Sequence, residues 1–262
     1  MSPSVNIIIA NCNYGQWLMG AVNSALNQTY NNISITVVDD GSTDDSWTIL
    51  NKEIFRPRPH EKVFPSDFDI KKCIVTSNNR DILFQAIRLD RNYGPSFARN
   101  QAIDLMIDKT NFFLILDADD EMYPNKTLRL LDAAMRMPNM IGIVYADYMT
   151  LNTENELKRI EYKENYSYQR LMQECIIHSG SLISRDVLLK VKDANGYYDN
   201  FMRVCEDYDL WLRMTRHCIA HHVPECLSLV RVTPHNSTNS VANETWQQCY
   251  NRMRNKFNSV QP

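Results

Sequence analysis

Residues 112–121 read Phe-Phe-Leu-Ile-Leu-Asp-Ala-Asp-Asp-Glu, an apolar run of five residues followed by four acidic residues out of five. A short apolar run bounded by polar residues is typical of a strand buried in a parallel sheet. In such a sheet, ligands bind beyond the carboxyl ends of the strands. Asp117 and Asp119 are separated by one residue, so both carboxylates can turn toward one hard divalent cation. A solvated acidic loop would show the same short pattern, so the metal hypothesis depends on the residues around it.

Two strand-loop-helix units precede this stretch. The β-branched run 5–10 is followed by turn-forming residues and an amphipathic segment at 16–28. The run 33–38 is followed by an acidic turn and a helical segment whose apolar face includes Trp47 and Leu50. Two such units in succession predict an α/β fold with a mostly parallel sheet.

Further elements are expected downstream, although the periodic pattern weakens after about residue 150. Residues 56–72 are rich in proline and charge, which predicts a surface insertion. Strands are predicted at 73–76, 84–89, 112–116, 141–146, 180–184 and 227–232. Helices are predicted at 96–108, 124–135, 206–216 and 243–257.

Composition places the chain among ordinary globular proteins. It has 262 residues, of which 44% are hydrophobic and 23% are charged, and its net charge is -3. This balance gives no overall attraction to nucleic acid, and Arg252, Arg254 and Lys256 are expected to form a solvated helix face. No segment approaches the roughly 18 apolar residues of a membrane span, and no secretion signal is recognisable. We therefore expect a cytoplasmic protein, with its seven cysteines as free, mostly buried thiols.

A second acidic segment follows the second predicted strand. Residues 39–44 read Asp-Asp-Gly-Ser-Thr-Asp. Acidic side chains after a strand can accept hydrogen bonds from the hydroxyl groups or base of a nucleotide. Thr43 and Asp44 are also good N-caps for the following helix, and capping alone would explain half of the motif.

With this segment, the chain resembles glycosyltransferase family 2, a set of enzymes with the GT-A fold that transfer a sugar from a nucleotide-sugar donor. Val-Val-Asp-Asp-Gly-Ser-Thr-Asp at 37–44 is among the most frequent signatures of that family. Four further matches follow in the expected order: Asn92-x-Gly94 with Ala98-Arg99-Asn100, the D-x-D element in 116–120, the Glu-Asp motif in 205–213, and an Arg/His loop with Arg231 and His235.

The resemblance implies a donor site. Asp40 would face a uracil-type base, and Asp39, Asn11 and Asn13 would line the same pocket. Cys12 stands where many relatives carry an aromatic or hydroxyl residue.

It also implies a metal site for Mn²⁺ or Mg²⁺. Asp119 would be the principal ligand, Asp117 would contact the ribose or a metal-bound water, and His235 is a further candidate ligand. Arg99 and His235 would supply positive or hydrogen-bonding groups near the diphosphate. Simpler roles stay open, because Arg99 could pair with a surface carboxylate and His235 could be an ordinary loop residue.

On the acceptor side, Asp207 would be the general base and Glu206 would place the acceptor. Asp207 shares a helix face with Leu210 and Trp211, whereas Asp209 projects elsewhere. Trp211 is expected to be a core residue rather than a platform for a sugar.

The resemblance therefore implies a metal-dependent, inverting glycosyltransferase with a nucleoside-diphosphate sugar, UDP-sugar favoured, as donor. Residues 1–120 would form the nucleotide-sugar-binding half, and 121–262 the acceptor-binding half and a C-terminal extension of the same domain. The acceptor would be a glycan or a lipid-linked saccharide, and the latter would bring the enzyme to the cytosolic face of a membrane as a peripheral contact. Inversion follows from the family and from the lack of a recognisable nucleophile.

Two other functions remain as alternatives. One is a catalytically degenerate protein that binds a nucleotide sugar or a partner without turnover. The other is a sugar-1-phosphate nucleotidyltransferase, which needs a glycine-rich, basic loop after its first strand. Residues 11–16 contain one glycine and no lysine or arginine, which disfavours this second alternative.

Overall fold

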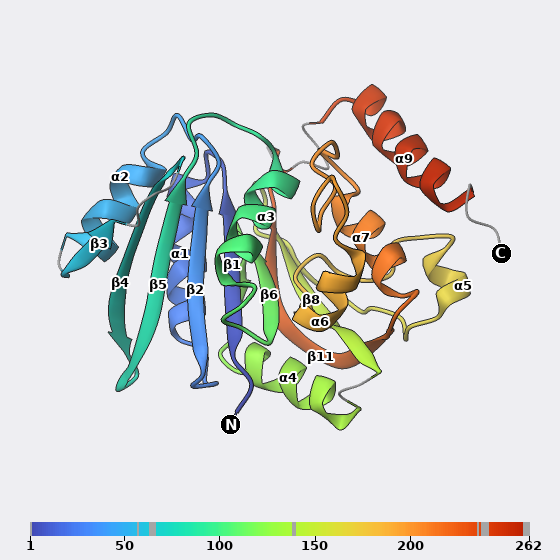
Figure 1. Cartoon of the computed structure of the whole chain (residues 1–262), viewed down its shortest axis with the longest axis horizontal. Coiled ribbons are helices and arrows are strands. Elements are labelled where there is room, and N and C mark those ends of the chain that lie inside the picture. The colour runs from blue at the N-terminus through green and yellow to red at the C-terminus, as the bar shows by residue number, and fades with distance from the viewer. Residues whose placement is uncertain are drawn as a thin grey trace.

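The structure, a computed structural model, describes residues 2–56, 58–62, 67–137, 140–234, 236 and 241–258. Helices flank both faces of one large sheet (Figure 1). The strands are β1 (Val5–Asn11), β2 (Ile33–Asp39), β3 (His60–Lys62), β4 (Asp69–Ser77), β5 (Arg80–Arg88), β6 (Phe112–Asp117), β7 (Glu121–Met122), β8 (Ile141–Asn152), β9 (Lys158–Glu161), β10 (Leu182–Ser184) and β11 (Ile219–Val232). The helices are α1 (Gly15–Leu26), α2 (Ser46–Leu50), the π-helical turn η1 (Asn51–Phe55), α3 (Pro95–Met106), α4 (Lys126–Arg136), α5 (Tyr168–Leu171), α6 (Arg185–Val191), α7 (Glu206–Met214) and α9 (Asn243–Asn258).

The sheet is mostly parallel at its centre. Its strand order is β3-β4-β5-β2-β1-β6-β10-β8-β11-β7, with β9 paired to β8. Strands β5, β2, β1 and β6 are all parallel, whereas the short β10 is antiparallel to both β6 and β8. The parallel strands therefore end at one edge of the sheet, where β1, β2 and β6 finish in Asn11, Asp39 and Asp117.

Successive side chains of the central strands pack into two different hydrophobic cores, one on each face of the sheet. In β1, Ile7 and Ile9 pack with α1, α2 and α4, whereas Ile8 packs with α3, α6 and α7 on the other face. This alternation is expected for a strand covered by helices on both sides, because neighbouring side chains point to opposite faces. The predicted apolar run behaves in the same way, since Phe113 and Leu114 are both fully buried but belong to opposite cores.

Several predicted boundaries are wrong. Segments 73–76 and 84–89 belong to one longer hairpin, β4–β5, closed by Asn78 and Asn79, both of which have positive φ. Two asparagines in this conformation are typical of a tight hairpin turn. Part of the predicted surface insertion at 56–72 is also strand, because β3 pairs with β4 and β4 begins at Asp69.

Strand β11 is much longer than the predicted 227–232. Its register with β8 shifts between Val223 and Cys226 and again between Cys226 and Leu229. Pro224, which lies inside the first shift, lacks the amide hydrogen that a regular ladder needs, so the strand pattern is interrupted there. The sequence pattern therefore revealed only the last part of the strand.

Two expectations about side chains also need correction. All seven cysteines are free, as predicted, but only Cys73 and Cys249 are buried and the other five are half-buried. In α9, Arg254 is exposed, whereas Arg252 and Lys256 form ion pairs with the buried carboxylate of Asp199. The predicted solvated basic face is therefore wrong for two of its three members, because buried acidic groups hold them. In the described part of the chain, no helix has the length and apolarity needed to cross a membrane.

The turn after β2 tests how tightly this edge is packed. Gly41 has φ +63°, and a Cβ atom there would lie 2.2 Å from the carbonyl carbon of Arg91. We expect Gly41→Ala to lower the free energy of unfolding by about 2–4 kcal/mol, from the left-handed conformation and the backbone clash together. Urea denaturation would measure this loss.

Gly20→Ala is the matched control. Gly20 lies inside α1, and its added Cβ would meet only the end of the Glu121 side chain, at 2.9 Å. A side-chain tip can move, and alanine is a better helix former than glycine by about 1 kcal/mol, so this variant should be neutral or slightly more stable. Equal losses in both variants would show that the turn at Gly41 is not tightly packed.

Candidate functional site

The floor of the site lies where β1 and β2 end. Asn11 and Asp39 are paired in register, and Asn11 Nδ2 donates a hydrogen bond to Asp39 Oδ1 at 2.8 Å and to Ser42 Oγ at 3.1 Å. Both residues are almost fully buried, and burial raises the pKa of Asp39 despite the hydrogen bonds from Ser42 and Asn11. Asp39 Oδ2 and Asn11 Oδ1 are closed off from solvent and have no hydrogen-bond partner among the described residues. These two side chains therefore lie beneath the protein surface at the carboxyl ends of β1 and β2.

Asn13 and Asp44 shape the loop after β2. Asn13, with φ 61°, accepts hydrogen bonds at Oδ1 from the amides of Thr43 at 2.8 Å and Asp44 at 3.2 Å. Asp44 in turn accepts from the amides of Gly15 at 2.9 Å and Ser46 at 3.0 Å, at the starts of α1 and α2. The N-cap residue of α2 is Asp45, which makes no side-chain capping bond, so the N-cap role predicted for Thr43 and Asp44 is wrong by position. Asp44 nevertheless binds the first amide of each helix.

Asp40 holds a different loop. Its two carboxylate oxygens accept hydrogen bonds from the backbone amides of Tyr93 at 2.7 Å and Gly94 at 2.8 Å. The side chain is buried, and burial raises its pKa even though both amides favour the charged form. In this structure, Asp40 thus anchors the 92–94 segment that precedes α3.

Arg99 joins the two acidic motifs. Its guanidinium donates to Asp117 Oδ1 at 2.8 Å and to Glu206 Oε1 at 2.5 Å. The Arg99 side chain is only 6% exposed, compared with 32% for Asp117 and 12% for Glu206. Burial alone would raise the pKa of Asp117, but the guanidinium holds it below its usual value. The partners of Arg99 are therefore not surface carboxylates but two residues of the predicted site.

Asp119 is held by the end of β11. Asp119 Oδ2 accepts a hydrogen bond from Asn236 Nδ2 at 3.0 Å, and its backbone oxygen accepts from Arg231 Nη1 at 2.7 Å. Arg231 also donates its amide to Asp120 Oδ1 at 2.9 Å and forms an ion pair with Glu121. Burial and the nearby Asp117 raise the pKa of Asp119 to about 7. Arg231 thus holds the acidic loop, and Asn236 is a residue of the site that motif matching missed.

Lys126 lies beside this acidic loop and was also missed. It is the first residue of α4, is 2% exposed, and lies 3.4 Å from Ser228 Oγ. Burial lowers its pKa to about 8, against the opposing fields of Asp120 and Asp117. A lysine at a helix N-terminus is unfavourable with respect to the helix dipole, and this local conflict was the signal available in the sequence.

Asp207 sits in the first turn of α7. The helix begins after Cys205, which has φ 58° and makes no side-chain capping bond. Burial and the neighbouring Glu206 raise the pKa of Asp207 to about 7. Trp211 is fully buried, as predicted for a core residue. Asp207 is therefore a partly buried carboxylate with a pKa near neutrality, next in sequence to Glu206, which pairs with Arg99.

The segment before β10 completes the surroundings of Asp117. Ser179 Oγ lies 3.5 Å from Asp117 Oδ2, and the ring of His178 packs on Tyr148 with a centroid separation of 4.2 Å. Burial and the nearby Lys126 lower the pKa of His178 to about 3, so this histidine is neutral. No periodic pattern marked this part of the sequence.

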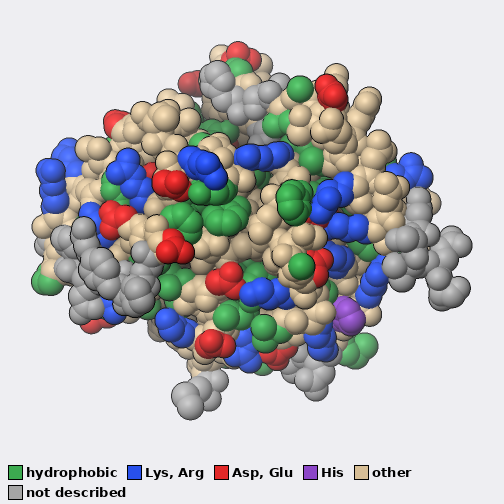
Figure 2. All heavy atoms as spheres, turned by 45° about the horizontal axis from the view of Figure 1, so that its top comes forward, with side chains coloured by type: hydrophobic (Ala, Val, Ile, Leu, Met, Phe, Trp, Pro, Cys, Tyr) green, Lys and Arg blue, Asp and Glu red, His purple; other side chains and the backbone are tan. Residues whose placement is uncertain are grey.

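His235, predicted as a metal ligand, lies outside the described residues. Among those that are described, no group of three or more His, Cys, Asp or Glu side chains is placed to hold a metal ion. One or two carboxylates are nevertheless sufficient for Mg²⁺ when substrate phosphates supply further oxygen ligands. Asp119 fits a site of that kind for a divalent cation. Its carboxylate is a hard oxygen donor in an acidic loop, and its pKa is raised. Figure 2 turns this edge of the sheet toward the reader and shows acidic and basic side chains interspersed across the face.

Comparison with known proteins identifies the family. The family model described as glycosyl transferase family 2 matches residues 6–65 and 70–192, which is more than half of the chain. The chain belongs to glycosyl transferase family 2. The matched residues include Asp39, Asp40, Arg99, Asp117 and Asp119 but not Glu206 and Asp207, which lie beyond the match.

Curated relatives carry glycosyltransferase names. An uncharacterized glycosyltransferase of Rickettsia typhi is 28% identical over 250 residues, covering 93% of this chain and 68% of the relative. One of Rickettsia conorii is 28% identical over 253 residues, and there the chain spans only 36% of the relative. The O-antigen biosynthesis glycosyltransferase WbnJ of Escherichia coli is 25% identical over 252 residues, covering 94% of this chain and 85% of WbnJ.

Solved structures confirm the predicted fold. TarS of S. aureus has a TM-score of 0.65 and 16% identity, with 95% of this chain and 39% of that chain covered. TarS 1-349 in complex with UDP has a TM-score of 0.62, and this chain covers 64% of it. The α/β class with a mostly parallel sheet flanked by helices, as in the GT-A fold, is therefore confirmed.

The ion pairs of Arg99 with Asp117 and Glu206 predict a pH-dependent loss of stability in Arg99→Met. Removing the guanidinium leaves Asp117 and Glu206 without their shared partner, and we expect a loss of about 3 kcal/mol at pH 7. Arg99 keeps the pKa of Asp117 low, so its stabilising effect is present at neutral pH and is lost as the pH falls. The difference between variant and wild type should therefore shrink toward about pH 4, as Asp117 becomes protonated in the variant. Urea denaturation at several pH values would measure it.

Arg185→Met is the control, because Arg185 pairs with Asp186, whose side chain is 73% exposed. An exposed pair contributes less than about 1 kcal/mol. If the two variants lost the same stability, Arg99 would not be an important ionic link.

Proposed function

We propose that this protein transfers a sugar from a nucleoside-diphosphate sugar, with a UDP-sugar favoured, to a hydroxyl group of a glycan or lipid-linked saccharide. The transfer is inverting and depends on Mn²⁺ or Mg²⁺. The observation that carries the proposal is the position of Arg99, which contacts both Asp117 at the end of β6 and Glu206 at the start of α7. Donor-side and acceptor-side motifs that lie far apart in the sequence thus meet at one guanidinium.

The donor lies across the carboxyl ends of β1, β2 and β6 in this proposal. Asn11, Asn13, Asp39 and Asp40 form that region, with Asp39 below its surface and Asp40 holding the 92–94 loop over it. The complexes of S. aureus TarS with UDP and with UDP-GlcNAc support UDP as the nucleotide. Residues 1–120 would supply most of this half.

Asp119 would hold the divalent cation, with Asp117 and His235 as further candidates. When bound, the cation supplies positive charge that stabilises the departing nucleoside diphosphate. Asn236 and Arg231 keep the Asp119 side chain and backbone in place. Arg99 adds a fixed positive charge beside Asp117 and orients Glu206.

Asp207 would be the general base. It takes the proton from the acceptor hydroxyl, whose oxygen attacks the anomeric carbon from the face opposite the leaving group. The bond from that carbon to the diphosphate oxygen breaks, the nucleoside diphosphate leaves with the electron pair, and the configuration inverts. Glu206, fixed by Arg99, places the acceptor. The match to WbnJ, an O-antigen biosynthesis enzyme, supports a glycan acceptor in the half formed by 121–262. A lipid-linked acceptor would bring the protein to a membrane surface.

Thermal-shift measurements with UDP, GDP, CMP and dTDP, each with and without Mn²⁺, test the donor site. A ligand at a hundred times its dissociation constant stabilises the folded state by about 2.7 kcal/mol. For a protein of this size that corresponds to a rise of roughly 5–10 °C in midpoint. We expect a Mn²⁺-dependent rise with UDP.

Asp119→Asn should abolish the Mn²⁺-dependent part of this rise, because it removes the charge while keeping an oxygen for Asn236. Asp186→Asn, which alters an exposed carboxylate on α6, should leave it unchanged. No rise with any nucleotide at millimolar concentration would contradict the proposal and favour a catalytically degenerate protein that binds a partner.

Asp207→Asn tests the base. We expect kcat to fall by about 10²–10⁴-fold, the usual contribution of a general base, with the UDP and Mn²⁺ thermal shift retained. In the wild type, kcat/KM should rise with pH through about 7, because Asp207 must lose its proton before it can accept one. Initial rates from pH 5.5 to 8.5 at saturating metal would record both effects.

The pH-dependent rise should disappear in the residual activity of Asp207→Asn. Asp186→Asn should keep the wild-type kcat and the wild-type pH dependence of kcat/KM. Sugar transfer that is unimpaired in Asp207→Asn, with donor and metal saturating, would exclude Asp207 as the base.

A further inference from the structure

The C-terminal helix α9 covers the part of the molecule that contains α7. Cys249, Met253 and Phe257 lie on one face of α9 and are buried in the same core as Leu210 and Trp211 of α7. Figure 1 shows α9 as a separate element reached after β11, lying beside α7. A helix far from the acidic loop in sequence is thus packed against the helix that carries Asp207.

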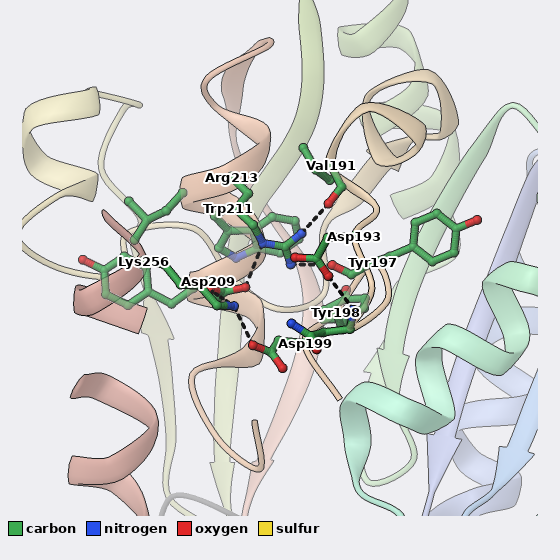
Figure 3. A network of polar contacts seen from close by, with 12 residues as sticks. Val191, Asp193, Tyr197, Tyr198, Asp199, Asp209, Trp211, Arg213 and Lys256 are labelled. Carbon is green, nitrogen blue, oxygen red and sulfur yellow. Dashed lines mark hydrogen bonds and ion pairs between the residues drawn. The ribbon is translucent and has the colours of Figure 1, made fainter. Parts of the chain in front are cut away.

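Lys256 of α9 reaches two buried carboxylates. Its Nζ lies 2.6 Å from Asp199 Oδ2 and 2.8 Å from Asp209 Oδ1. Asp209 is 0% exposed and Asp199 is 1% exposed. Figure 3 shows the lysine extending from α9 between the two acidic side chains. Buried carboxylates need a counter-charge, and here one ammonium group serves both.

The same carboxylates have second cationic partners. Asp209 Oδ2 accepts from Arg213 Nε at 2.8 Å, and Arg213 also donates to the backbone oxygen of Val191 at 2.8 Å and to that of Tyr197. Asp199 Oδ2 accepts from Arg252 Nε at 2.7 Å. The network therefore joins α9, α7, the end of α6 and the segment between α6 and α7.

That segment is fixed at its other side by α3. Asn100 Oδ1 accepts from the amide of Tyr198 at 2.9 Å, and Asn100 Nδ2 donates to the Tyr198 backbone oxygen at 2.7 Å. Asn100 follows Arg99, whose guanidinium holds Glu206. The first turn of α7 is thus held from α3 through Glu206 and from α9 through Asp209.

We infer that Lys256 is a positioning residue for the reaction, because it fixes the first turn of α7 and hence the place of Asp207. Asp207 lies two residues before Asp209 on the same short helix, so a displacement of one carboxylate moves the other. The start of α7 lacks a side-chain cap, which leaves it dependent on tertiary contacts. The inference rests on the proposed function for its effect on catalysis. The contacts of Lys256 with Asp199 and Asp209, which hold α7 in place, do not depend on that function.

Lys256→Met tests the inference. The variant keeps an unbranched side chain but leaves the two buried carboxylates without their shared ammonium. We expect kcat to fall on the order of tenfold to a hundredfold, because a displacement of about 1 Å of a reacting group has that effect. KM for the nucleotide sugar should stay within about twofold, since no donor-side residue is touched.

Two further variants separate positioning from general damage. Lys256→Arg retains the positive charge and should recover most of kcat. Arg254→Met removes an exposed cation from the same helix and should keep wild-type kcat and KM. A folded Lys256→Met with unchanged kcat would overturn the inference, as would equal losses in Lys256→Met and Arg254→Met.

Hydrogen exchange provides a readout that does not require turnover. Amides of residues 199–209 should exchange faster in Lys256→Met than in the wild type, while those of β1 and β2 keep their rates. If Lys256→Met does not fold, Lys256→Gln, which can still donate to one carboxylate, takes its place with the same expectations. Inactive wild-type protein would refute the proposed function alone. Unchanged amide exchange of residues 199–209 in Lys256→Met would refute only the inference that Lys256 holds the first turn of α7 in place.

Discussion

The organisation of the site depends on the ion pairs that the guanidinium of Arg99 forms with two carboxylates. It is buried between Asp117, at the end of the central strand β6, and Glu206, at the start of α7. Burial alone would raise the pKa of Asp117, and the guanidinium holds it below its usual value. A planar group with several donors can bind both carboxylates at once. Because Arg99 belongs to α3, the sheet, the acidic loop and α7 are held in one arrangement.

A similar balance of charge extends through the neighbouring elements. In the acidic loop 117–121, burial and neighbouring carboxylates raise the pKa of Asp119 and Asp120, whereas Arg99 holds that of Asp117 low. Arg231 from β11 and Lys126 from α4 supply fixed positive charge beside this loop, and both are largely buried. Lys256 of α9 and Arg213 of α7 likewise supply positive charge beside the buried carboxylate of Asp209. The fold thus places basic side chains beside closely spaced carboxylates, which offsets part of the repulsion among them.

Much of the fold followed from local pattern. The continuous apolar runs of β1, β2 and β6 predicted buried parallel strands, and the structure covers both of their faces with helices. The polar residues at the ends of these strands were also recognisable, since short motifs that are weak one by one become specific when several occur in order at strand ends. The pattern was less informative where strands are irregular. β11 is interrupted at Pro224, and the surroundings of His178 and Ser179 belong to segments without a regular period.

The sequence by itself determined the α/β class, the order of the longer strands and helices in the first 150 residues, and the residue types at the ends of the parallel strands. Only the tertiary structure decided what those residues contact. Asp40 binds the amides of Tyr93 and Gly94, Arg99 joins partners from two other elements, and Lys256 of α9 reaches Asp209 of α7. The physical reason is that periodicity reports which face of an element is apolar, a property of neighbouring residues. The pairing of buried charges depends on how separate elements dock across the sheet, and residues distant in sequence carry no local signal of that docking.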